Sequence, residues 1–166
     1  MRLRRIIAGF DAGTCRRETL QAIAALAAET QADVLGVFIE DTSLLELARL
    51  PFAAEVGHAS ALPRGLDVET LERALRFHAE ALRRALAAAF EPSGVQWSFR
   101  VARQPPSQAL AAALAEGLAP ALLIPPRGKP LAERSVVREP QLDAVLLREL
   151  IEAARPVLVL PREDGS

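Results

Sequence analysis

The chain has 166 residues, of which 51% are hydrophobic and 25% charged, and its formal net charge is −1. This length suits one domain with a sizeable core, and the balanced charge gives no electrostatic argument for nucleic acid or an anionic membrane as a partner. A single cysteine excludes an intrachain disulfide, no Cys/His set has metal-ligand spacing, and no signal peptide or membrane span is visible, so we expect a cytoplasmic protein without a bound metal.

The first half of the chain alternates apolar strands with helices. Residues 5–10 form an apolar run that ends at Asp11 and predicts a strand followed by a turn. An apolar stripe at helical spacing predicts a helix over 18–32. A run without charge predicts a second strand over 34–39, of the kind that is covered on both faces. Residues 42–65 then form a long insert, and such inserts often serve as lids or interface pieces.

The second half continues the alternation. A long helix is predicted over 67–90, and His78 falls inside its apolar stripe, where we expect it to pack rather than to react. Residues 95–101 alternate with period two, which predicts a half-exposed strand near an edge of the sheet. The remaining expected elements are a helix over 105–116, a strand over 121–124, a loop to about 140, a helix over 142–154 and a strand over 157–160.

This order of elements defines the expected fold class. Strands that alternate with helices of about ten or more residues predict an α/β domain in three layers, with an open, parallel, five-stranded sheet and right-handed crossovers. The sequence carries no internal repeat and no low-complexity segment. We therefore expect residues 1–166 to form a single domain, with 42–65 as an insert between the second strand and the long helix.

Three segments together resemble the universal stress protein family. The first strand ends at Asp11 and a turn of small residues, the second strand ends in the acidic pair Glu40-Asp41, and the last helix runs into a Pro-Val-Leu-Val-Leu segment at 156–160. The resemblance covers the chain from Ile6 to Leu160. It implies the fold of that family, which is adenine nucleotide alpha-hydrolase-like, with strand order 3-2-1-4-5 and a topological switch point between strands 1 and 4.

The resemblance also implies a nucleotide site at the switch point. In nucleotide-binding members, an Asp at the position of Asp11 contacts the ribose and the backbone at the position of Phe38 contacts adenine. The phosphates lie on a Gly-x-x-Gly turn after strand 4 and on a Gly-Ser/Thr pair at the start of the last helix. The candidate cofactor is therefore an adenine nucleotide, and the candidate ligand-binding residues are Gly9, Asp11, Phe38, Arg127, Gly128 and Lys129.

Two features of this sequence depart from the family pattern. The turn after strand 4 reads Pro125-Pro126-Arg127-Gly128, and proline supplies neither the N–H group nor the permissive backbone that a phosphate cradle needs. The Gly-Ser pair aligns with Asp143-Ala144, where a carboxylate would cap the helix and repel a phosphate. We therefore expect the ATP site, as the family builds it, to be lost.

Two functions remain open. The first is a regulatory or interaction module without catalytic residues, which forms a homodimer through an exposed edge strand of Val157, Leu158, Val159 and Leu160. The second is a switch that binds a nucleotide or another anion through Asp11 and the basic loop 127–138, with or without slow hydrolysis of the nucleotide. The sequence argues against an enzyme, because it lacks the motifs of a receiver domain, a flavin carrier, a serine hydrolase and a phosphate-binding loop.

Cys15 carries a separate hypothesis. It lies at the start of a predicted helix beside Arg16 and Arg17, whose positive charges would lower the pKa of the thiol. A low thiol pKa is typical of a redox sensor. The alternative is an unreactive small residue in the first turn of the helix.

Overall fold

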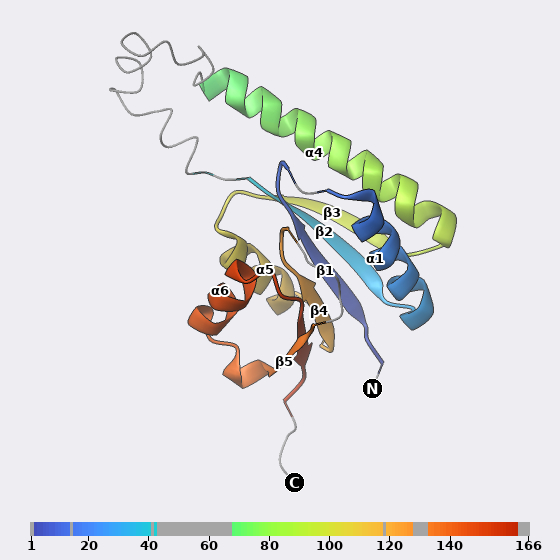
Figure 1. The fold of residues 1–166 in the computed structure, drawn as a ribbon, viewed down its shortest axis with the longest axis vertical. Helices are drawn as coiled ribbons and strands as arrows, with labels where there is room; N and C mark the ends of the chain where they lie inside the picture. Colours follow the sequence, from blue (N-terminus) through green and yellow to red (C-terminus); the bar gives the residue numbers. More distant parts are fainter. Residues whose placement is uncertain are drawn as a thin grey trace.

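A six-stranded sheet runs through the molecule, with helices on both of its faces (Figure 1). The computed structural model describes residues 2–13, 15–40, 42, 68–117, 119–127 and 133–162. The strands are β1 Arg5–Phe10, β2 Asp33–Ile39, β3 Trp97–Ala102, β4 Ala121–Ile124, β5 Ser135–Arg138 and β6 Val157–Leu160. The helices are α1 Arg17–Thr30, α4 Val68–Phe90, α5 Pro106–Ala115 and α6 Ala144–Glu152, with short 3-10 turns η1 Glu91–Ser93 and η2 Glu139–Gln141.

Two hydrophobic clusters sandwich the sheet. One lies between the sheet and helices α1 and α4, and the other lies between the sheet and helices α5 and α6. The central strands are apolar throughout because both of their faces are covered, and β1 and β4 contribute to both clusters. The predicted three-layer α/β architecture is therefore confirmed. Strand β3 alternates between exposed and half-buried residues over most of its length and occupies one edge, as its period-two pattern predicts.

The strand order is β3-β2-β1-β4-β6-β5. The five strands expected from the sequence stand in the expected order, and β3, β2, β1 and β4 are parallel. The expectations of five strands and of a wholly parallel sheet are wrong. Strand β6 runs antiparallel to β4, with Leu123 opposite Val157 and Ala121 opposite Val159, and a sixth strand, β5, pairs in parallel with β6.

Strand β5 is the physical reason for the reversal. The chain leaves β4 at the carboxyl ends of the parallel strands. Strand β5 then carries it back toward their amino ends before α6 begins. Helix α6 runs back to the carboxyl ends of the parallel strands, so β6 starts there and runs antiparallel to β4. The segment expected to be loop up to about residue 140 therefore contains a strand, and Val157–Leu160 is an interior strand with neighbours on both sides.

The helix ends show how local sequence sets the boundaries. Helix α1 begins one residue earlier than expected, with Arg16 at its N-cap. The side chain of Asp143 caps α6 and accepts a hydrogen bond from the Leu146 N–H at 2.6 Å, as a carboxylate at that position predicts. Helix α6 ends in a Schellman motif, in which Arg155 N–H donates to Leu150 and Ala154 N–H donates to Ile151.

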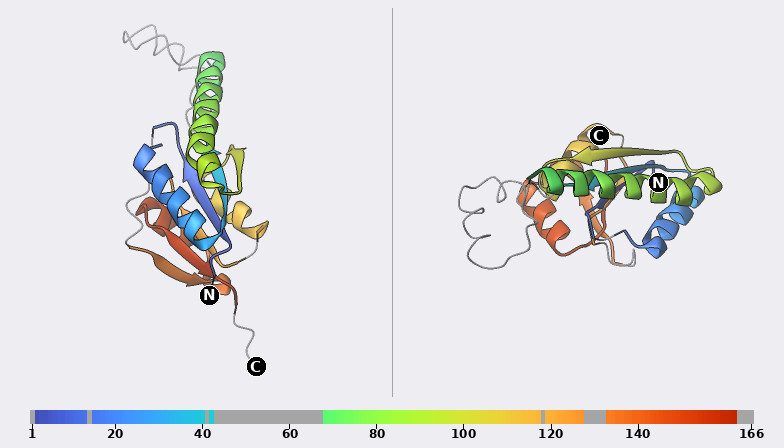
Figure 2. Two further views of the ribbon diagram at one scale, coloured as in Figure 1. Left: turned by 90° about the vertical axis from the view of Figure 1, so that its right-hand side faces the viewer. Right: turned by 90° about the horizontal axis from the view of Figure 1, so that it is seen from above.

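Helix α4 is the longest of the described elements, and its 23 residues span about 34 Å at 1.5 Å per residue. Its amino-terminal part extends beyond the strands (Figure 2). His78, near the middle of the helix, is exposed although Leu75 and Ala79 beside it are buried, so the expectation that it packs into the core is wrong. Among the described residues, no helix combines the length and the apolar character that a membrane span needs.

Candidate functional site

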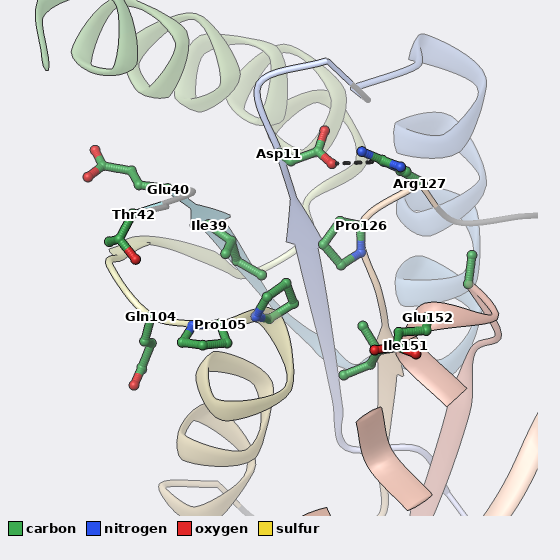
Figure 3. Close-up of a pocket in the computed structure, with 12 residues that line it drawn as sticks. Asp11, Ile39, Glu40, Thr42, Gln104, Pro105, Pro126, Arg127, Ile151 and Glu152 are labelled. Atoms are coloured by element: carbon green, nitrogen blue, oxygen red, sulfur yellow. Dashed lines mark hydrogen bonds and ion pairs between the residues drawn. The ribbon is translucent and has the colours of Figure 1, made fainter. Parts of the chain in front are cut away.

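A cavity lies at the carboxyl ends of the parallel strands, at the switch point between β1 and β4 (Figure 3). We call it the carboxyl-edge cavity, and its volume is about 530 Å³. Its walls come from the ends of β1, β2 and β4, from the start of α5 and from the end of α6. The lining residues are Asp11, Ile39, Glu40, Thr42, Gln104, Pro105, Pro106, Pro126, Arg127, Ile151, Glu152 and Ala154.

Asp11 and Arg127 meet across this cavity. Asp11 follows β1, Arg127 belongs to the turn after β4, and Arg127 Nε donates to Asp11 Oδ2 at 3.4 Å. The second carboxylate oxygen of Asp11 accepts a hydrogen bond from the Gly13 N–H at 3.1 Å. Arg127 has φ 63°, a left-handed conformation that is uncommon for a residue with a side chain. The sequence correctly places Asp11 opposite the proline turn. The carboxylate of Asp11 is bound by Arg127 and by the Gly13 N–H of the same chain.

Gly9 lies beneath Pro126. A Cβ atom at Gly9 would lie 3.0 Å from Pro126 Cδ and 3.2 Å from Ile39 Cδ1, so the absent side chain leaves room for the proline ring. Pro126 is buried. Pro126, in the turn that follows β4, therefore occupies the space beside Gly9, which was a candidate ligand-binding residue.

Phe38 lies on the other side of Asp11. Its side chain is almost fully buried, and the residue pairs with Phe10 and with Val101 in the sheet. Phe38 lines a separate hollow of about 350 Å³ beside α4, together with Asp11, Cys15 and His78, whereas Arg127 lines the carboxyl-edge cavity. Phe38 and Arg127, two of the predicted site residues, thus line two different hollows, which share Asp11.

The basic loop does not converge on Asp11. Arg134 lines a third hollow, formed with Leu158 and Leu160. Arg138 pairs with Leu160 at the end of the sheet that lies away from the carboxyl-edge cavity. Arg127 is the basic residue that reaches Asp11 within the part of the loop that the structure describes. Gly128 and Lys129, like residues 43–65 of the insert, lie outside the described residues. The expected anion site over 127–138 is therefore not assembled by Arg134 and Arg138, because β5 carries Arg138 away.

Helix α6 presents the opposite end to the one expected. Because β6 is antiparallel to β4, the cavity is lined by Ile151, Glu152 and Ala154 at the carboxyl end of α6, and Asp143 lies at the far end of the helix. A helix carboxyl end carries partial negative charge and offers carbonyl groups, which disfavour a phosphate. The interpretation that Asp143 itself repels a phosphate at the site is wrong.

The start of α5 also lines the cavity, but it offers few donors. Pro105 is the N-cap and Pro106 is the first helical residue, and neither has a backbone N–H. Together with Pro126, three prolines therefore line a position where a phosphate cradle would need free N–H groups.

Two further carboxylates line the cavity. Glu40 is 3% exposed, and its Oε2 lies 2.7 Å from Arg103 Nε, yet among the described residues no donor meets this oxygen in hydrogen-bond geometry. Glu152 pairs with Arg148 along α6 at 2.9 Å. The sequence shows Glu40 as the acidic residue that follows the second strand. The sequence does not identify Glu152 as a site residue, because its place at the cavity depends on the direction of α6.

No group of three or more potential metal ligands forms within the described part of the chain.

The surroundings of Cys15 do not lower its pKa. Although the residue is exposed, desolvation by neighbouring atoms raises the pKa of the thiol. The expected effect of Arg16 and Arg17 is therefore absent, and the interpretation of Cys15 as an activated thiol loses its physical basis.

Comparisons with known proteins identify the fold. No family model matches the sequence, and no curated protein is similar to it in sequence. A protein of the universal stress protein family from Burkholderia pseudomallei is 20% identical over 95% of this chain and 96% of its own, with a TM-score of 0.51. The hypothetical protein MJ0577 is 14% identical over 99% and 100%, with a TM-score of 0.50. A universal stress protein in complex with cAMP is 12% identical over 99% and 100%, with a TM-score of 0.44. At identities of 20% and 14%, the likeness to the first two structures establishes the fold alone.

Proposed function

We propose that this chain, which has the universal stress protein fold, is a non-catalytic regulatory or interaction module that does not bind ATP in the way its family resemblance implies. The observation that carries the proposal is the seating of Pro126 over Gly9, with Arg127 paired to Asp11 beside it. A stress-related role and a cytoplasmic location belong to the same proposal.

Two contacts and the direction of one helix support the loss of a nucleotide site. The Pro126 ring fills the space above Gly9, and Arg127 engages the carboxylate that would meet a ribose. The end of α6 that faces the cavity is its carboxyl end, so a triphosphate would meet the negative end of the helix dipole and Glu152. The donors and positive charge that a phosphate needs are largely replaced by prolines and carboxylates.

The alternative, a nucleotide- or anion-binding switch, depends on Arg127. This side chain is 79% exposed, and the pair that it forms with Asp11 at 3.4 Å is long and solvent-accessible. Exposed pairs of this kind are worth little, about 0–1 kcal/mol, so an anion could displace Asp11 as the partner of Arg127. This exposed and displaceable pair is the observation that favours the alternative.

A thermal-shift titration separates the two functions. ATP, ADP, AMP, cAMP and inorganic phosphate are each added to the wild-type chain and to Arg127→Ala. A ligand at 100 times its Kd stabilises the native state by about 2.7 kcal/mol, which for a domain of this size raises Tm by about 5–11 °C. We expect no shift with any of them. A shift in the wild type that disappears in Arg127→Ala would favour the switch.

We propose self-association through β5 in place of β6. The predicted edge strand Val157–Leu160 is interior, and the open edge on that side belongs to Ser135–Arg138, where Val136 is 61% exposed. A strand edge pairs readily with a second copy of the same chain. We expect a dimer by size exclusion with light scattering, and a monomer for Val136→Asp. The matched control is Val145→Asp, which alters an equally exposed valine on α6. A monomeric wild type would contradict this part of the proposal.

A further inference from the structure

We infer that the third hollow, the one that Arg134 lines, binds a medium-chain fatty carboxylate. We call it the leucine hollow, and its volume is about 440 Å³. It shares no lining residue with the carboxyl-edge cavity. The inference therefore goes beyond the proposed function and does not rest on it.

An incompletely covered face of the sheet forms the floor of the leucine hollow. On the face that α5 and α6 cover, Val157 and Val159 of β6 are fully buried. On the opposite face Leu158 and Leu160 remain half-buried, although Leu158 touches the cluster beneath α1 and α4. Beside them on β5, Val136 is 61% exposed. The described helices therefore leave an apolar part of this face in contact with solvent.

Helix α1 and the chain ahead of β1 supply apolar walls. Leu26 belongs to α1 and Leu3 precedes β1, and both are half-buried residues that line the hollow. With the two leucines of β6, four leucines line a space whose volume falls within the range of roughly 300–1,000 Å³ that small-molecule sites occupy. Such sites are mostly apolar and carry a few polar groups that orient the ligand. An alkyl chain is stabilised here because it buries its methylene groups against the leucines.

Arg134 supplies the polar group. Its side chain lines the hollow, is exposed, and forms no ion pair or side-chain hydrogen bond with another residue in the part of the chain that the structure describes. By contrast, Arg127 pairs with Asp11 in the carboxyl-edge cavity. A guanidinium group has five N–H donors, and its planar fork matches the two oxygens of a carboxylate. An arginine with available donors beside apolar walls therefore fits a ligand with an anionic head and an apolar body.

The carboxyl end of α1 suits the carboxylate of a ligand less well. Arg2 also lines the hollow, but its Nε donates to the carbonyl oxygen of Thr30 at 3.3 Å. Glu29 lines the hollow beside Thr30, and the carboxyl end of a helix carries partial negative charge. The charges therefore favour the carboxylate at Arg134, with the alkyl chain directed over the leucines toward α1.

The strand register sets the length of the chain that fits. Arg134 directly precedes β5, and Arg138 at the other end of β5 pairs with Leu160. Four residues thus separate Arg134 from the level of Leu160, which is about 13 Å at 3.3 Å per residue. A medium-chain acid can reach along this floor, whereas a short-chain acid held at Arg134 leaves the distant leucines uncovered.

Isothermal titration of the wild-type chain with three matched probes, each below its micelle concentration, tests the inference. Octanoate is the candidate ligand, octylammonium has the same chain with a cationic head, and butyrate has the same head with a shorter chain. We expect saturable heat with octanoate and binding at least about tenfold weaker with the other two, because each lacks one of the two interactions. Arg134→Gln should weaken octanoate binding about tenfold by removing the charged partner, and Leu160→Ala about threefold by removing apolar wall.

Arg148→Gln is the matched control, since it removes an exposed arginine from α6, on the other face of the sheet and outside the hollow. It should leave octanoate affinity unchanged. Absence of octanoate binding, equal binding of octylammonium, or unchanged octanoate affinity in Arg134→Gln would each overturn the inference. Loss of octanoate binding in Arg127→Gln but not in Arg134→Gln would assign the carboxylate to the carboxyl-edge cavity and would overturn it as well.

Discussion

The seat of Pro126 on Gly9 can be tested by adding one methyl group. In Gly9→Ala the new Cβ would lie 3.0 Å from Pro126 Cδ and 3.2 Å from Ile39 Cδ1, both closer than the favourable carbon–carbon separation of about 3.5–4.0 Å. Both neighbours are buried and cannot move freely. Overpacking of this kind costs about 1–3 kcal/mol, and the lower entropy of the unfolded chain returns about 0.4–1 kcal/mol. We expect a net loss of about 1–2 kcal/mol.

Urea unfolding followed by circular dichroism measures this loss, together with a fall in Tm of about 2–8 °C. The double variant Gly9→Ala/Pro126→Ala removes the clashing ring, and we expect the two changes to couple by about 1 kcal/mol. Gly13→Ala is the control, because its Cβ would meet only Asp11 Oδ1, at 3.9 Å. If Gly9→Ala is as stable as Gly13→Ala, and its effect adds to that of Pro126→Ala, then Pro126 does not occupy this place.

Three further predictions concern packing, a helix end and a thiol. Gly36→Ala should lose about 2–3 kcal/mol in the same urea titration, since its Cβ would lie 2.6 Å from Cδ1 of the fully buried Leu86; an unchanged midpoint would contradict this packing. Ala154→Gly should gain up to about 1 kcal/mol, because Ala154 ends α6 at φ 52°, and a loss would refute that conformation. Because desolvation raises its pKa, the Cys15 thiol should react with iodoacetamide at neutral pH more slowly than free cysteine, as mass spectrometry would show; faster reaction would restore the redox hypothesis.

The sequence predicts those strands whose burial on one or both faces determines the order of apolar and polar residues. The strands β1, β2 and β4 are covered on both faces, so they appear as apolar runs, and β3 is half-exposed, so it alternates. Strand order followed from the family resemblance. The exposure of His78 could not be predicted, because the buried face of α4 runs through Leu75, Ala79 and Leu82 and is narrower than the apolar stripe in the sequence, so that His78 lies beside it.

The direction of β6 could not be predicted for a different reason. An apolar run such as Val157–Leu160 satisfies the core equally well in either direction, and its neighbours decide which one it takes. The deciding neighbour is β5, in which Val137 is buried while the rest of the strand is exposed or half-buried. Four residues with one buried side chain give no clear period, so the segment resembles a loop.

The same reversal limited the prediction of the site. Asp11 and the proline turn lie at the ends of strands whose order follows from the resemblance, and they do meet in the structure. The residues that α6 contributes depend on which end of the helix faces the cavity. Helical periodicity is identical in both directions, so Ile151 and Glu152 could not be distinguished in advance from Asp143 as the residues at the site.

The most direct test of the proposed function is an isothermal titration of the wild-type chain with ATP in the presence of Mg²⁺. With Pro126 over Gly9 and Arg127 on Asp11, we expect no saturable heat up to millimolar ATP, which corresponds to binding weaker than about −4 kcal/mol. A saturable isotherm with a micromolar Kd, lost on substitution of Asp11 by Ala, would contradict the claim that this turn has closed the nucleotide site.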